Sequence, residues 1–170
     1  MGTVYKIDGI GTRGNPASDN PFELVNKERR LRFVRMFASE ALAKGDAVAL
    51  DLTNTEPTNG YGNHVLKADT SDDVNFHAIG IATEACDSGD LVSIQVAGYC
   101  DFAKIHASDT AAGDEGDLLV GSQTAGQLEK LVTDAARGAG GDSLPCAILI
   151  DYIGAAAASS KVYLLKPANL

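Results

Sequence analysis

The sequence predicts an all-β protein made of short antiparallel strands and preceded by an extended N-terminal arm. Three observations predict this class: short apolar runs of strand length, glycine-rich turns between them, and the recurrence of similar runs in the second half of the chain. With 18 glycines in 170 residues, the chain has room for many tight turns. A chain of this length also buries most of the surface that its unfolded form exposes. We expect one domain over residues 31–170 and an arm over residues 1–30.

The recurrence has a nearly constant offset, which indicates an internal duplication. Three pairs of matched residues lie 71, 69 and 70 positions apart: Gly45 and Gly116, Ala78 and Ala147, and Val92 and Val162. Each half has the pattern of a meander with one apolar face, and neither half alone buries that face. The two halves are therefore expected to close on each other as one barrel or sandwich. A chance match is the alternative, because Gly-Asp turns are common.

The elements follow in order along the chain. Residues 9–21 combine glycine, proline, asparagine, aspartate and serine, a mixture that favours neither helix nor strand. From residue 31 onward, apolar or aromatic runs between turn residues predict strands. These runs cover residues 31–37, 47–52, 65–68, 78–83, 91–97, 118–120, 128–132, 147–153 and 162–165. Helix is predicted only as a turn or two, over residues 108–112 and 133–136.

Charge is distributed unevenly between the arm and the body. Residues 1–37 hold seven basic and four acidic residues, a net charge of +3, so the remainder of this −9 chain carries −12. Such a body repels a phosphate backbone, which argues against nucleic acid as a partner. The basic run from Lys27 to Arg35 suits an acidic surface on another protein or on another copy of this chain. The alternative is a solvated strand edge, where charges deter unwanted pairing.

No apolar run reaches the ~18 residues of a membrane span, and no apolar signal core stands at the N-terminus. We therefore expect a protein that is soluble, is not exported and has no membrane partner. The three cysteines Cys86, Cys100 and Cys146 lack metal-site spacing, so buried free thiols are expected. The three histidines are scattered singly, as structural histidines often are.

Four motifs suggest chemistry that their surroundings do not support. Residues 9–14 match G-x-G-x-x-G, but Pro16 and Pro21 follow where a dinucleotide site needs a helix. Residues 141–144 spell GDSL, yet no histidine follows to serve as a base for Ser143. Residues 69–75 begin like a calcium loop but carry Val74 where the turn requires glycine. The acidic string at residues 109–117 is explained by solvated turn charges. We expect no catalytic residue, metal or cofactor.

The order of the remaining motifs resembles the head decoration, or cement, proteins of tailed phages. The motifs are R-F-V-R-M-F at residues 32–37, A-K-G-D-A-V at 43–48, I-G-I-A at 79–82, G-D-L-V-S-I-Q-V-A-G at 89–98, A-G-D at 112–114, G-Q-L at 126–128 and V-Y-L-L-K-P at 162–167. The resemblance covers residues 31–167. It implies a small barrel or β-tulip that sits on the outer surface of the capsid at threefold or quasi-threefold positions. It also implies a homotrimer that binds the major capsid protein and reinforces the shell, made in the host cytoplasm.

The family's extended N-terminal segment, which reaches the shell or a neighbouring subunit, is the one feature that transfers to this chain. Interfaces need apolar centres and charged rims, and this segment supplies both. Its candidate interface residues are Phe22, Leu24, Arg29, Arg30, Arg32 and Arg35.

Two other function classes remain open. One is a hydrolase that uses Ser143 in a site completed by oligomerisation. The other is a carrier or ligand-binding module of the barrel-sandwich type, with Lys44 at an exposed turn. The sequence Ala43-Lys44-Gly45-Asp46 lacks the flanking hydrophobic residues of such a carrier.

Overall fold

The computed structural model describes residues 31–53, 62–69, 77–106, 114–131, 144–151 and 158–165. These residues form nine strands and no helix, which confirms the all-β class. The strands are β1 (Arg32–Ala38), β2 (Ala47–Leu50), β3 (His64–Lys67), β4 (Gly80–Ala82), β5 (Leu91–Ile105), β6 (Leu118–Gly121), β7 (Leu128–Lys130), β8 (Ala147–Leu149) and β9 (Ala158–Leu164). The predicted arm and the predicted helical turns at residues 108–112 and 133–136 lie outside the described residues.

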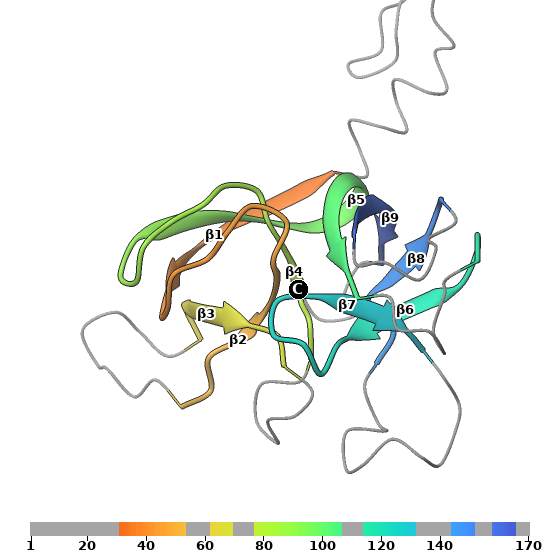
Figure 1. Ribbon diagram of the computed structural model, residues 1–170. Coiled ribbons are helices and arrows are strands. Elements are labelled where there is room, and N and C mark those ends of the chain that lie inside the picture. The colour runs from red at the N-terminus through yellow and green to blue at the C-terminus, as the bar shows by residue number, and fades with distance from the viewer. Residues whose placement is uncertain are drawn as a thin grey trace, which may run out of the picture.

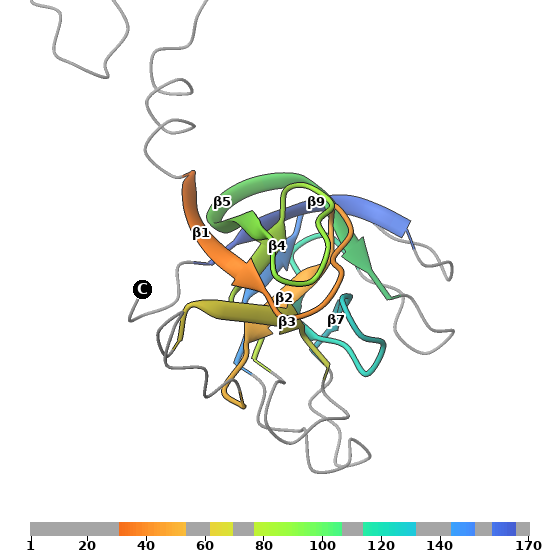
Figure 2. The same ribbon diagram turned by 90° about the vertical axis from the view of Figure 1, so that its left-hand side faces the viewer.

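The strands close into two five-stranded barrels that share β5 (Figure 1). In the N-terminal barrel, β1 pairs with β3 and β5, β2 pairs with β3 and β4, and β4 pairs with β5. In the C-terminal barrel, β5 pairs with β7 and β9, β6 pairs with β7 and β8, and β8 pairs with β9. Figure 2 shows the N-terminal barrel end-on, with β1, β2 and β3 toward the viewer.

Strand β5 passes from one barrel to the other at Gly98. Its first part pairs with β1, and its part from Gly98 onward pairs with β9. Gly98 has a φ of 93°, which L-residues with a side chain rarely adopt. The buried Gln95 amide donates a hydrogen bond to the carbonyl of Tyr99 at 2.7 Å and so holds this bend. The predicted end of the strand at residue 97 is therefore wrong, because Gly98 bends the strand without ending it.

The topology confirms the internal duplication and corrects its form. Each of the five pairings in the N-terminal barrel has a counterpart of the same direction in the C-terminal barrel, including the parallel pairs β1–β3 and β5–β7. Each half thus closes on itself, and neither is a meander. The registers match Gly80 with Ala147 and Ile94 with Val162. The sequence-based pairs in this region were two residues out of step, a slip that leaves every side chain on the same face.

Three Gly-Asp turns with one geometry lead into strands. In each turn the glycine has a φ of 90°, and the aspartate Oδ2 accepts a hydrogen bond from the backbone N–H three residues earlier. The glycine N–H in turn donates to the carbonyl of a neighbouring strand segment, as Gly45 does to Ala82 and Gly116 to Leu149. The turns are residues 43–46, 87–90 and 114–117. A short motif common in loops is therefore a specific structural unit here.

The outer wall of the N-terminal barrel packs against the C-terminal barrel. Alternate residues of β2 divide between two cores: Val48 faces the inside of its own barrel, whereas Ala47 and Ala49 join the core of the C-terminal barrel. The backbones also meet, because Ala47 N–H donates to Gly126 O at 2.8 Å and Gly126 N–H to Ala68 O at 2.9 Å. Small side chains on this wall allow that approach.

Candidate binding surfaces

The first candidate surface is the exposed face of β1. The burial of this strand alternates: Val34, Met36 and Ala38 face inward, while Phe33 is 53% exposed and Arg35 is exposed beside it. β1 pairs with β3 only at its last two residues, so its earlier part has β5 as its strand partner on one side. This placement suits both a basic docking strand and a charged edge that deters pairing.

The second candidate surface is a row of apolar and aromatic residues across the C-terminal barrel. Each member lies directly opposite the next on neighbouring antiparallel strands, so the four side chains share one face of the sheet. Leu118 and Tyr99, at the two ends, are 41% and 40% exposed. The two central members are partly exposed. We call this set the C-terminal row: Leu118 on β6, Ile148 on β8, Tyr163 on β9 and Tyr99 on β5.

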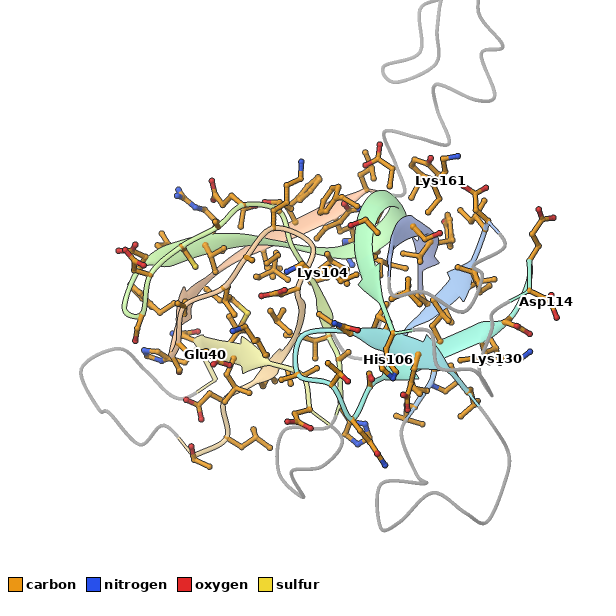
Figure 3. The ribbon with its side chains drawn as sticks, in the orientation of Figure 1. Glu40, Lys104, His106, Asp114, Lys130 and Lys161 are labelled. Atoms are coloured by element: carbon orange, nitrogen blue, oxygen red, sulfur yellow. The ribbon has the colours of Figure 1, made fainter. Side chains whose placement is uncertain are left out.

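Charged groups flank the C-terminal row at both ends (Figure 3). Near Leu118, the turn at residues 114–117 carries the exposed Asp114 and Glu115. In the same turn Asp117 pairs with Lys130 at 2.7 Å. Near Tyr99, Lys161 pairs with Asp151 at 2.7 Å. The hydrogen bond from Lys161 to Asp151 is the main cause of a raised pKa at Lys161. The end of the row at β6 is therefore acidic.

The structure places two of the six predicted interface residues. Arg32 and Arg35 lie on β1, and both are exposed. The other four, Phe22, Leu24, Arg29 and Arg30, lie outside the described residues. Sequence reasoning missed the C-terminal row. Leu118 and Ile148 stand within continuous apolar runs that predict strands but do not indicate which side chains face outward, and the strand pairing reveals it.

The residues of the rejected or alternative motifs lie as follows. Lys44 is exposed at its turn, and its Nζ lies 4.7 Å from the centre of the Phe102 ring. Residues 9–14, Ser143 and residues 70–75 of the calcium-like segment lie outside the described residues. In the acidic string, Asp117 Oδ2 accepts the N–H of Asp114 at 2.6 Å. Within the described ranges, no group of three or more His, Cys, Asp or Glu side chains is placed to hold a metal ion.

The cysteines are free thiols, as predicted, but only Cys100 is fully buried as a residue. Burial raises the pKa of all three thiols, and at Cys146 it raises the pKa to about 12. His64 is buried and stacks on Phe37 with ring centres 5.5 Å apart, which gives it a structural role. No helix in the described part of the chain is long and apolar enough to cross a membrane.

Fold and surface together define an all-β protein with two fused barrels of one topology and exposed apolar residues on their walls. No family model and no curated protein matches the sequence. Among solved structures, the chain is similar to the head fiber gp8.5 N base of bacteriophage phi29, with a TM-score of 0.49 and 11% sequence identity over 79% of this chain and 94% of that one. A likeness at this level says nothing about the residues of either candidate surface.

Proposed function

We propose that this chain is a structural protein of a tailed-phage head, which decorates the outer surface of the capsid and reinforces it. In this role it binds the major capsid protein at threefold or quasi-threefold positions and associates with itself as a homotrimer. The proposal rests first on the resemblance of residues 31–167 to head decoration proteins, whose shared motifs are turns and strands and not catalytic residues. Two of the three Gly-Asp turns, with Gly45-Asp46 and Gly89-Asp90, are part of those motifs.

The observation that carries the proposal is the position of β1. The basic segment at residues 27–30 leads directly into this strand, where Phe33 and Arg35 are exposed. Aromatic residues and arginine are the residues that most often dominate the energy of protein interfaces. A basic arm that continues into an exposed aromatic strand is what a protein needs to dock onto an acidic surface, of the shell or of a neighbouring copy.

Attachment in this proposal depends on the arm. Residues 1–26 are rich in glycine, proline and asparagine, a composition that favours ordering against a partner. Ordering costs roughly 1–2 kcal/mol per residue. Phe22 and Leu24 offset part of that cost, because burying each contributes about 1.5–3 kcal/mol. Arg29 and Arg30 orient the arm and make the binding sensitive to salt.

The test is co-sedimentation with shells assembled from the major capsid protein that is encoded with this chain. Deleting residues 1–26 should leave the melting temperature nearly unchanged and weaken shell binding strongly. Arg29→Glu or Arg30→Glu should weaken binding and reduce its salt dependence. Lys44→Glu reverses the same charge on an exposed turn and should bind normally. Shell binding by the truncated protein that equals that of the full chain would rule out this role for the arm.

A further inference from the structure

The duplication provides an internal reference for the C-terminal row, because every member has a counterpart in the N-terminal barrel. The counterparts form the same cross-strand series: Ala47 lies opposite Ile81, Ile81 opposite Gln95, and Gln95 opposite Phe33. Ala47 and Ile81 are fully buried and Gln95 is 2% exposed. Three of the four counterparts are thus covered, and the fourth, Phe33, is 53% exposed. In the C-terminal row all four members are at least partly exposed.

The cover over the N-terminal wall is itself a barrel of this fold. The glycine turn between β6 and β7 lies on the N-terminal wall, where Gly126 forms backbone hydrogen bonds with Ala47 and Ala68. Strand β5 adds a backbone hydrogen bond from Lys104 N–H to Gly45 O at 3.0 Å and an ion pair between Lys104 and Asp46. A wall of this topology is therefore suited to receive another barrel of the same topology. The corresponding wall of the C-terminal barrel carries large apolar side chains that are exposed to water.

From this comparison we infer that the acidic end of the C-terminal row is a docking face for a second copy of this chain, which inserts the exposed face of its β1. The two faces are complementary. Leu118 and Ile148 lie beside the acidic Asp114 and Glu115, whereas β1 presents Phe33 beside Arg35. Four of the five lysines in the described ranges are already held in ion pairs with carboxylates of their own copy. Arg35, exposed beside Phe33 on the same face of β1, is the cation that we match to the acidic turn.

The contact is heterologous when each copy gives its β1 face to one neighbour and its C-terminal row to another. Figure 1 shows β1 in the barrel on the left and β6 and β8 in the barrel on the right. A head-to-tail contact closes into a ring when the rotation between copies allows it, and otherwise gives an open filament. A closed ring of three is the arrangement that the proposed homotrimer requires. This inference rests on the self-association in the proposed function, and its tests use no shells, so its failure leaves shell binding by the arm untouched.

The first test measures the mass of the full chain in solution by sedimentation velocity over a range of concentrations. The wild type should form a defined oligomer. Leu118→Ser should raise the dissociation constant at least about tenfold, as expected for truncation of a central apolar contact. Leu52→Ser changes a more exposed leucine of the N-terminal barrel, 64% exposed against 41% for Leu118, and should leave association unchanged. A wild type that stays monomeric, or an L118S variant that associates as tightly as L52S, overturns the inference.

A second test exchanges the charges of two exposed residues across the proposed contact and leaves the core unchanged. Glu115→Arg and Arg35→Glu should each weaken association, and the double variant should restore it, because the exchanged pair again attracts. Failure of the double variant to recover association overturns the pairing of these two faces.

Cross-linking separates the heterologous contact from its alternatives. Leu118→Cys and Phe33→Cys chains, mixed under mild oxidation, should form a disulfide-linked dimer that contains one of each. Each variant alone should form few dimers. The native thiols interfere little, because their raised pKa values leave them protonated near neutral pH. Dimers of Leu118→Cys alone would show a symmetric contact, and monomers throughout would show that the row is covered by the chain's own arm or by nothing; either result contradicts the inference.

Discussion

Substitution of Gly45 by alanine tests the contact between the two barrels, because the duplication supplies matched controls. Gly45, Gly89 and Gly116 occupy the same position in three turns of one geometry, each with a φ of 90°. A Cβ at Gly89 or Gly116 would meet no atom within 4 Å. At Gly45 it would press into the carbonyl oxygen of Phe102, which belongs to the part of β5 that builds the C-terminal barrel.

The expected loss of folding stability has two parts, one from the backbone conformation and one from the clash. Forcing alanine into this left-handed conformation costs about 1–3 kcal/mol at each of the three turns. At Gly45 the clash adds about 1–3 kcal/mol of overpacking, since a backbone atom of the other barrel must move and the hydrogen bond from Lys104 N–H to Gly45 O is strained. A loss of 1 kcal/mol lowers the melting temperature of a chain of this size by roughly 2–4 °C.

Thermal unfolding followed by circular dichroism measures the difference. Gly45→Ala should melt at least about 3 °C below Gly116→Ala and Gly89→Ala, which should resemble each other. Equal losses at Gly45 and Gly116 would mean that the two barrels do not press together at this turn, and the close packing of the N-terminal wall would then be wrong.

Three further predictions concern the C-terminal barrel and the thiols. Burial tends to raise the pKa of Asp117, but the hydrogen bonds from Lys130 and from the Asp114 N–H lower it below the ordinary 3.8. The ion pair between Asp117 and Lys130 therefore stabilises the fold above that pH. The melting-temperature difference between wild type and Asp117→Asn should vanish as the pH falls below 3.8. Because Asp117 is already bonded to Lys130, EDTA should leave the melting temperature unchanged, and a drop of several degrees would reveal a cation at the acidic turn. Because burial raises the pKa of Cys146 to about 12 and also that of Cys100, Ellman's reagent at pH 8 should react with these thiols only after unfolding. Rapid reaction of either thiol in the native protein would contradict the raised pKa values.

The strands were predictable because their signals are local. Short apolar runs between turn residues mark all nine strands, and the recurrence of Gly45 at Gly116 reveals the duplication. The closure of each half was not predictable, because it depends on parallel pairing of β1 with β3, which joins Phe37 to His64. No short-range pattern specifies such a pair. The end of the strand before Gly98 was predicted wrongly for a related reason. A glycine can mark either a turn that ends a strand or a bend within one.

The candidate surfaces were only partly predictable. Composition indicates that Arg32 and Arg35 are surface residues, and they are exposed. The outward position of Leu118 depends on the register of β6 against β8, which pairs it with Ile148. An apolar residue that faces solvent has the same sequence signal as one in a core, so the row becomes visible only when strand pairing is known.

Divergence between the two walls explains how one duplicated unit can serve two purposes. Ala47 and Ala68 form backbone hydrogen bonds with Gly126 of the C-terminal barrel, and Ala49 packs in the same core. Larger side chains at these positions would separate the barrels. Their counterparts are Leu118, Val120 and Leu131, which are too large for such an approach. Of these, Val120 is fully buried and Leu118 is exposed. A contact made through Leu118 and its neighbours in the C-terminal row keeps the backbones apart and is held by apolar area and charge at its rim. Such a contact can form between separate chains and can also be broken, whereas the alanine wall suits a permanent contact within one chain.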